Sequence, residues 1–433
     1  MLPPSPSHPQ APQSPERAVQ SHFTSTRPTE LIIESEKAEI PGTAGSETGS
    51  SSAVSTGSSA TSTTLIPSMS DEPSPWLKEH QTSSRRSRRF LTLAGIVIFF
   101  GAIAGTIYFF VNRANASRMY TDQASQQPPT QPAASLNLTI TRDRRLHKSF
   151  YGLNYTPQKS QLPWCGDTLQ DVIDDVKIMS QLTPRLRLYG TDCNVANWTL
   201  YAINALKINM GVILTVWVDG NSTTYDRQHK DVLNVLKAYG TAHIDGISIG
   251  NEVLFRASNQ ANLSIVAEDL YSKIETVKQE LSFNGWGSVP VFTTDVSYET
   301  NSTLVNIEDK VSGNIHPYFA GTTVETAANW TIGYTQNNMI PISAGKEFII
   351  SEVGWPTEGS TYQGAVPGTD NLQYFLNSFL CRANQISNMP YYFFEAFDEP
   401  WKSSYGVLET SWGLFDKNKN LKVNIPDCEV PGR

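Results

Sequence analysis

Residues 348–356 read Phe-Ile-Ile-Ser-Glu-Val-Gly-Trp-Pro. Three successive apolar residues predict a strand that is buried on both faces, as in a parallel sheet, and Gly354 and Pro356 end that strand. Glu352 places a carboxylate at the end of this buried element, where an unpaired charge would be costly. Residues 247–253, Ile-Ser-Ile-Gly-Asn-Glu-Val, repeat the pattern with Glu252. Two strands that each deliver one carboxylate at their C-terminal end predict a two-carboxylate site.

Strands and helices alternate through the surrounding sequence. Strands are expected at 151–155, 185–189, 212–218, 244–251, 289–294, 314–318, 348–351 and 391–397, and amphipathic helices at 169–179, 228–239, 261–281 and 371–386. Eight strands with helical crossovers predict an α/β fold, a (β/α)8 TIM barrel. Its last unit is abbreviated, because residues 400–427 show no long amphipathic helix. The alternative is an open doubly wound sheet, but no Gly-rich phosphate loop follows any strand.

The sequence before the barrel predicts a membrane anchor. Residues 1–89 are rich in Ser, Thr, Pro and Gly and predict a disordered cytoplasmic tail. Residues 90–111 carry no charge, and at about 1.5 Å per residue they span a bilayer core of roughly 30 Å. A buried core helix of this length would show a polar stripe. A cleaved signal peptide would begin near residue 1 and have a shorter apolar run. Residues 112–145 are expected to form an extracellular stalk, and residues 146–433 the catalytic barrel.

Arginines set the expected orientation of this signal-anchor. Arg85, Arg86, Arg88 and Arg89 precede the apolar run, so the positive-inside rule predicts a single-pass type II protein of the plasma membrane with its C-terminal part outside. Cysteines and Asn-X-Ser/Thr sequons agree, because they lie beyond the run. The predicted glycosylation sites are Asn137, Asn197, Asn221, Asn262, Asn301 and Asn329. The chain has 41 acidic and 33 basic residues, which argues against a nucleic-acid partner.

The four cysteines predict two disulfides. Four cysteines allow three connectivities. Cys165 and Cys193 follow the first two strands and belong to adjacent loops, whereas Cys381 lies late in a helix that the C-terminal tail must pass. We therefore expect Cys165 to pair with Cys193 and Cys381 with Cys428.

The C-terminal strand ends, where barrel enzymes place their sites, carry acidic and aromatic residues. The candidate substrate contacts there are Tyr155, Arg187, Tyr189, Trp217, Asn251, Asp295, His316, Tyr318, Trp355, Glu399 and Lys402. Aromatic faces suit the apolar C–H faces of sugar rings, and no metal-ligand or cofactor spacing is present. Structural interpretations remain open: Arg187 as an ion-pair partner of a glutamate, Trp217 and Trp355 in the core, His316 as a structural histidine, and Glu399 with Lys402 as a simple ion pair.

Glycoside hydrolysis needs such a pair of carboxyl groups. One protonates the leaving oxygen, and the other, ionised, attacks the anomeric carbon in a retaining enzyme. The fourth and seventh strands of an eight-stranded barrel face each other across the mouth, so their terminal glutamates can act together. Asn251 is placed to bond a sugar hydroxyl, and Tyr318 is expected to hold Glu352 ionised.

Residues 249–253 (Ile-Gly-Asn-Glu-Val) and 351–356 (Ser-Glu-Val-Gly-Trp-Pro) resemble the signatures of family 17 of the glycoside hydrolases. Residues 314–318 and 413–416 also match its fungal branch, and the layout resembles the fungal type II membrane-anchored wall glucanases. This resemblance implies a retaining endo-1,3-β-glucosidase acting on wall β-glucan. It makes Glu252 the proton donor and Glu352 the nucleophile.

Two other functions remain open on the sequence. A β-1,3-glucanosyltransferase would share the first half-reaction and use a sugar hydroxyl in place of water. An inactive glucan-binding wall sensor is disfavoured, because both glutamates are present. The sequence does not predict the oligomeric state.

Overall fold

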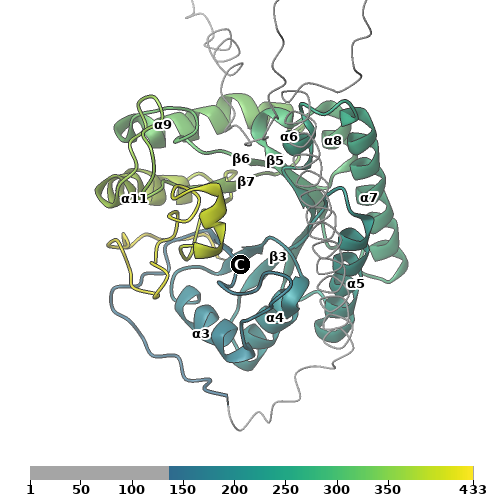
Figure 1. Ribbon diagram of the computed structural model, residues 1–433, viewed down its shortest axis with the longest axis horizontal. Coiled ribbons are helices and arrows are strands. Elements are labelled where there is room, and N and C mark those ends of the chain that lie inside the picture. Colours follow the sequence, from purple (N-terminus) through teal and green to yellow (C-terminus); the bar gives the residue numbers. More distant parts are fainter. Residues whose placement is uncertain (1–135, 433) are drawn as a thin grey trace, which may run out of the picture. The chain divides into compact units, whose positions relative to one another are not determined.

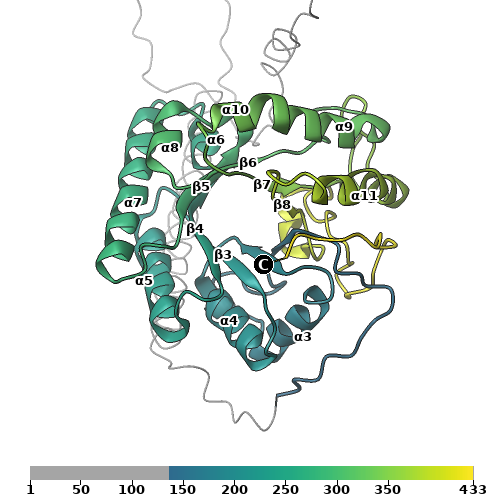
Figure 2. The same ribbon diagram turned by 180° about the vertical axis from the view of Figure 1, so that it is seen from behind.

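A computed structural model describes residues 136–432. Eight parallel strands close into a barrel in the order β1 to β8, and helices surround it (Figures 1 and 2). The strands are β1 (Gly152–Tyr155), β2 (Arg185–Leu188), β3 (Gly211–Val216), β4 (Ile244–Asn251), β5 (Val291–Val296), β6 (Val311–Asn314), β7 (Phe348–Val353) and β8 (Tyr391–Phe393). The predicted (β/α)8 barrel is therefore confirmed, and the open sheet is excluded.

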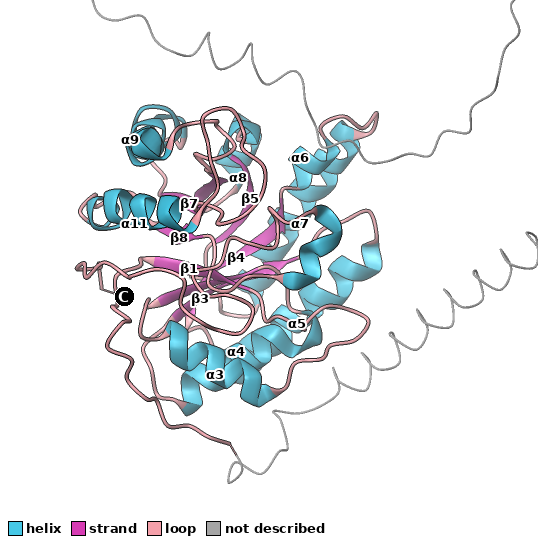
Figure 3. Cartoon of the chain, turned by 60° about the vertical axis from the view of Figure 1, so that its left-hand side comes forward, coloured by secondary structure: helices cyan, strands magenta, loops and turns pink. Residues whose placement is uncertain are grey.

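The helices lie between successive strands and outside them, as Figure 3 shows in a third view. They are α3 (Leu169–Met179), α4 (Val195–Ala205), α5 (Ser222–Tyr239), α6 (Val253–Ala257), α7 (Leu263–Phe283), α8 (Ser302–Ile307), α9 (Val324–Tyr334), α10 (Ile340–Ile342) and α11 (Thr369–Asn384), with short turns η2 (Asp192–Asn194), η3 (Ser297–Glu299), η4 (Thr335–Met339) and η5 (Pro400–Tyr405). Past β8, the described chain contains η5 and loops but no α-helix, as the abbreviated last unit requires.

Apolar side chains form two layers, one on each side of the strands. Alternate strand residues such as Leu186, Val212 and Leu214 join the large core beneath the helices. A second, small cluster consists of Ile213, Phe292, Ile349 and Tyr392. Since successive strand residues point to opposite faces, Ile213 points away from the layer of its neighbours and fills the barrel interior.

The strands β6 and β8 differ most from their predicted bounds. β6 begins at Val311 and ends at Asn314, so the prediction of residues 314–318 was too late. Gly313 and Asn314 have weak strand propensity, which hides the strand in the sequence. Gly313 is needed because a β-carbon there would meet the Cα of Ser297 at 3.1 Å. β8 ends at Phe393, four residues earlier than expected.

Glycine in the Glu-Val-Gly-Trp-Pro run has a structural reason. A β-carbon at Gly354 would lie 2.0 Å from the carbonyl oxygen of Phe394. Any other residue would push β8 away from β7, beside the strand segment that carries Glu352. The motif therefore holds the two strands together at the mouth of the barrel.

Both predicted disulfides are confirmed. Cys165 pairs with Cys193 and Cys381 with Cys428, with Cα–Cα distances of 5.1 and 5.2 Å. The cross-links close loops of 28 and 47 residues, which on the chain-entropy model stabilises the fold by roughly 3–4 kcal/mol each. The second one fastens the C-terminal segment across the last, helix-poor unit.

The segment before β1 lies against α3 and the turn that follows it. The backbone N–H of Asn137 donates to Gln170 Oε1 at 2.9 Å, and that of Asp143 donates to Gln181 Oε1 at 2.9 Å. The predicted tail (1–89), membrane span (90–111) and most of the stalk fall outside the described residues. Within residues 136–432, no helix has the length and apolar character needed to cross a bilayer.

Candidate active site

The two predicted catalytic glutamates lie at the same end of the barrel. Glu252 directly follows β4, and Glu352 lies near the end of β7. The Nδ2 of Asn314, at the end of β6, donates to Glu252 Oε1 at 2.8 Å. The same residue pairs with Glu352 in the sheet, and its Oδ1 accepts from Ser351 Oγ at 2.8 Å. One asparagine therefore contacts one glutamate directly and the strand of the other.

Irregular strand pairing directs both carboxylates to the mouth. On β7, Ile350 pairs with Gly313 but Glu352 pairs with the very next residue of β6, Asn314. β4 shows a similar shift against β5 between Ser248 and Asn251. Such a bulge re-aims side chains near a strand end. Glu252 itself has a left-handed backbone, with φ of 54°, and its N–H donates to Thr294 O.

Glu352 lies in a buried network of donors. Arg187 Nη1 and Tyr189 OH donate to its Oε1 at 3.1 and 2.8 Å, and His316 Nε2 lies 3.0 Å from its Oε2. Burial alone would raise the pKa of this carboxyl group, but the His316 hydrogen bond and the Arg187 charge outweigh burial and lower the pKa to about 2. Glu352 is therefore ionised at neutral pH.

The pKa of Glu252 shifts in the opposite direction. Burial raises the pKa of its carboxyl group, and the negative charge of Glu352 raises it further, while the Asn314 amide opposes both effects. The pKa values of the two carboxyl groups are therefore pushed apart, with that of Glu252 raised and that of Glu352 lowered. This division into an acid and an ionised partner is the arrangement that glycoside hydrolysis uses.

A family model described as the BtgE/BtgC glycoside hydrolase domain matches residues 152–413. The chain belongs to this family. A relative from Emericella nidulans, glucan endo-1,3-beta-glucosidase btgC, is 34% identical over 307 residues, covering 65% of this chain and 47% of its own length. One from Aspergillus niger is 39% identical over 313 residues, covering 67% of this chain and 45% of its own. The chain spans about half the length of these relatives.

A solved structure also resembles this glycoside hydrolase domain. The family 17 beta-1,3-glucanosyltransferase from Rhizomucor miehei is 29% identical, with a TM-score of 0.56, and the match covers 65% of this chain and 98% of that one. An active-site mutant of the same enzyme, in complex with laminaritriose, matches with a TM-score of 0.55. The likeness extends over the barrel that carries both glutamates.

In the BtgE/BtgC domain of this chain, Arg187 positions the site and does not contact substrate, because it is fully buried. Its Nη2 donates to Asn251 Oδ1 at 2.6 Å, and its Nη1 donates to Asn154 Oδ1 at 2.9 Å. The ion-pair interpretation of Arg187 was therefore the correct one. Asn154 and Asn314 were missed by sequence reasoning. The signal that could have found them is an amide side chain within or at the end of a buried strand.

Three aromatic residues predicted to contact substrate face the core, so those predictions were wrong. Tyr155 is buried, and its OH donates to Asp175 Oδ2 at 3.0 Å on α3. Tyr318 is also buried and donates to Ser360 O. Tyr189 instead takes the role beside Glu352 that we had predicted for Tyr318. Trp355 is fully buried, with its Nε1 donating to Val366 O at 2.9 Å.

Asp295 was also predicted to contact substrate, and it instead supports the backbone after Glu252. Its Oδ2 accepts from the N–H of Leu254 at 2.8 Å and its Oδ1 from that of Val296 at 2.8 Å. Burial raises its pKa to about 7, against the lowering effect of these hydrogen bonds. The side chain is buried, so its contribution is to hold the start of α6.

Four predicted contacts remain at or near the mouth. Asn251 adjoins Glu252, and His316 contacts Glu352. Trp217 is half-buried, with the Arg256 guanidinium 4.7 Å from its ring centre. Lys402 pairs with the buried Glu399 at 2.5 Å and lies 4.9 Å from the ring centre of Phe394. Glu399 with Lys402 thus forms the ion pair that the sequence left open, and substrate contact by Asn251 and Trp217 stays a prediction.

Proposed function

We propose that this chain is a retaining endo-1,3-β-glucosidase that acts on the β-glucan of the fungal cell wall. The observation that carries the proposal is the pair of glutamates at one mouth, with an ionised Glu352 and a Glu252 of raised pKa. The names of its fungal relatives support the substrate class.

In the first step the Glu252 proton passes to the glycosidic oxygen while a Glu352 carboxylate oxygen bonds to the anomeric carbon. The C–O bond to the leaving sugar breaks, and a glycosyl-enzyme forms. Arg187, Tyr189 and His316 hold the Glu352 carboxylate in place without protonating it.

The second step follows from the same electrostatics. Once Glu352 is esterified its negative charge is gone, and that charge is one of the two causes that raise the pKa of Glu252. The pKa of Glu252 therefore falls, and Glu252 becomes the base that takes a proton from water. The water oxygen bonds to the anomeric carbon, Glu352 leaves as the carboxylate, and the product retains its configuration.

Transglycosylation is the second candidate, favoured by the glucanosyltransferase name of the Rhizomucor miehei structure. It differs only in the acceptor of the second step. We expect residues 136–433, incubated with laminari-oligosaccharides of one length, to yield only shorter products, released first as β-anomers. Size analysis and NMR of fresh products measure both properties. Products longer than the substrate would contradict pure hydrolysis, and initial α-anomers would contradict retention.

We propose further that the enzyme is anchored in the plasma membrane through residues 90–111, with the barrel facing the wall. Two disulfides support an oxidising compartment. Among the predicted glycan acceptors Asn137, Asn262 and Asn329 have exposed side chains. By contrast, Asn197 accepts a hydrogen bond from Tyr239 OH at 2.7 Å, and the Nδ2 of Asn301 donates to Tyr271 OH.

This topology predicts the outcome of a protection experiment. Protease added to intact, wall-stripped cells should remove the barrel and spare an epitope tag at Met1, because the tail is cytoplasmic. Glycosidase should lower the apparent mass, with glycans mapped to the three exposed asparagines. Loss of the Met1 tag with a protected, unglycosylated barrel would reverse the orientation and remove access to wall glucan.

A further inference from the structure

The loop between β1 and α3 presents a tryptophan to solvent. The side chain of Trp164 is 80% exposed, and its neighbour Leu162 is also exposed. Tryptophan is on average a highly buried residue, so its exposure at this position of the fold, beside the exposed Leu162, calls for a reason. Because this loop follows β1, it lies at the C-terminal end of the barrel, the end that carries Glu252 and Glu352.

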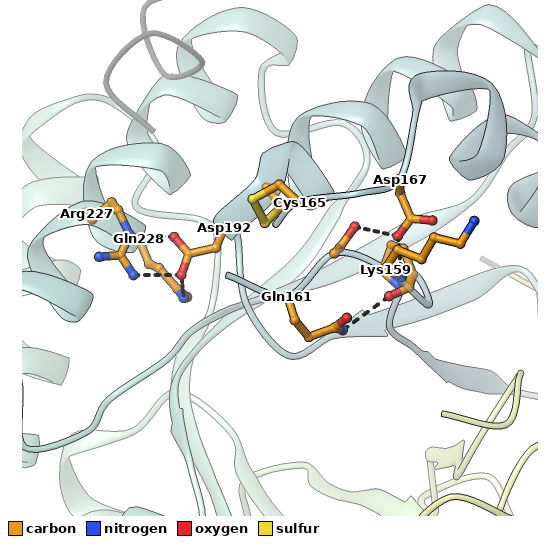
Figure 4. Close-up of a disulfide and its surroundings, with 10 residues drawn as sticks. Lys159, Gln161, Cys165, Asp167, Asp192, Arg227 and Gln228 are labelled. Atoms are coloured by element: carbon orange, nitrogen blue, oxygen red, sulfur yellow. Dashed lines mark hydrogen bonds and ion pairs between the residues drawn. A yellow bond between two sulfur atoms is a disulfide. The ribbon is translucent and has the colours of Figure 1, made fainter. Parts of the chain in front are cut away.

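The loop is fixed although its tip is exposed. Cys165, next to Trp164, is joined to Cys193. Asp167 Oδ2 accepts from the N–H of Lys159 at 2.7 Å and from Ser160 Oγ at 2.9 Å, and the Gly166 N–H donates to Lys159 O at 2.7 Å. Figure 4 shows the disulfide with the Asp167 and Lys159 contacts on one side of it. The indole is therefore presented by a pre-organised loop.

A continuous set of contacts leads from this disulfide toward the next strands. Asp192, beside Cys193, accepts from Arg227 Nε at 2.6 Å and from Gln228 Nε2 at 2.7 Å (Figure 4). Gln228 Oε1 in turn accepts from the Trp217 N–H at 2.8 Å. The loops after β1, β2 and β3 are thus tied together into one rigid rim.

The rim connects to the acid. Arg256, which lies over the Trp217 ring, donates from Nη2 to the carbonyl oxygen of Asn251 at 2.9 Å. Asn251 immediately precedes Glu252. The loops of the two tryptophans therefore belong to one contact network at the mouth. Trp217 contacts Arg256, which contacts the residue before the acid, and the Trp164 side chain is 80% exposed.

We propose that Trp164 is a polymer-binding position, where the indole face stacks on a sugar unit of the β-glucan chain remote from the scission point. The proposal rests on the proposed function and extends its substrate range. A rigid platform loses little conformational freedom when it binds. A long chain reaches both Glu252 and Trp164, whereas a short oligosaccharide occupies the catalytic subsites alone. The site thus favours polymer over oligomer.

The test compares Trp164→Ala and Trp164→Phe with the wild type on polymeric laminarin and on laminaritriose. We expect Trp164→Ala to lower kcat/KM on laminarin about tenfold, the scale of one aromatic contact, and to change kcat/KM on laminaritriose less than about twofold. Trp164→Phe should recover much of the loss. The control is Phe283→Ala, because Phe283 is 92% exposed and ends α7, which leads away from the mouth.

Two further measurements separate this inference from the proposed function. Insoluble β-1,3-glucan should deplete the wild-type domain and the Phe283→Ala variant from solution several times more strongly than Trp164→Ala, whether or not the glucan is cleaved. Unchanged depletion and unchanged laminarin kinetics in Trp164→Ala would overturn the inference, as would equal losses on both substrates. The inference would also be overturned if sedimentation shows a wild-type dimer that Trp164→Ala dissociates while glucan binding stays unchanged. The indole would then contact a second copy of the chain. A wild type that binds glucan through Trp164 but never cleaves it would instead overturn the proposed function.

Discussion

Glu352→Gln is expected to lower kcat on laminarin by about 10⁴-fold or more. The amide has nearly the same shape as the carboxylate and can still accept from Arg187 and Tyr189, which contact Oε1 in the wild type. However, it is not a nucleophile, so no glycosyl-enzyme forms. Steady-state kinetics, with trapping of the wild-type intermediate by a fluorinated glycoside and mass spectrometry, measure both effects.

A matched control separates chemistry from folding. Glu308 is another buried glutamate of the barrel, and burial raises its pKa to about 8. Glu308→Gln therefore changes little charge at neutral pH and should keep its activity. Glu352→Gln additionally leaves the Arg187 cation buried without its partner, so its melting temperature should fall, while binding to insoluble glucan persists. Full turnover by Glu352→Gln would remove Glu352 from the mechanism.

The barrel and its two glutamates could be predicted because both depend on coarse features of the sequence. Buried parallel strands read as continuous apolar runs, and all of their C-terminal ends meet at one mouth. A charge directly after such a run, as at Glu252, must therefore lie near that mouth. The same argument placed Cys165 and Cys193 in adjacent loops, and their disulfide confirms it.

The lining of the site depended on finer features. Tyr155 ends β1 and points to Asp175 on α3, whereas Asn154, one residue earlier, contacts Arg187 inside the mouth. Because side chains alternate along a strand, a difference of one residue decides between core and site. On β7 the bulge near Glu352 changes this alternation, and no pattern of residue types marks it. The sequence also could not show that Tyr189 would replace Tyr318 beside the nucleophile.

Buried charge was the second feature that the sequence did not reveal. Glu395 is buried at the mouth, where burial and the charge of the nearby Glu399 raise the pKa of its carboxyl group. Lys402 lies 4.0 Å from Glu395 and closer still to Glu399. The Glu-x-x-Lys spacing predicted the ion pair of Glu399 with Lys402. That Glu395 is the third member of this cluster depends on the turn after β8, which brings it beside Lys402 only in the folded chain.

Glu252→Ala is expected to lower kcat/KM on laminarin by about 10²–10⁴-fold, the usual contribution of a general acid. The loss should be smaller on an aryl glycoside with a good leaving group, because departure of that group needs no proton. The second step then becomes limiting, since no base activates water. Sodium azide should restore turnover of the aryl glycoside, because a small anion can enter the space of the missing carboxylate.

The stereochemistry of the rescued product and the pH profile test the assignment. Azide attacks the glycosyl-enzyme from the face opposite Glu352, so the product should be the β-glycosyl azide, identified by NMR. In the wild type Glu252 acts in its protonated form, and its pKa is raised. Activity should therefore fall as the pH rises through that pKa, and this alkaline limb should be absent in Glu252→Ala. As a control, Glu299→Ala changes a half-buried glutamate of the loop after β5. This variant should keep the alkaline limb of the wild type, and azide should not change its activity. An α-glycosyl azide, or an unchanged alkaline limb in Glu252→Ala, would show that another residue supplies the proton.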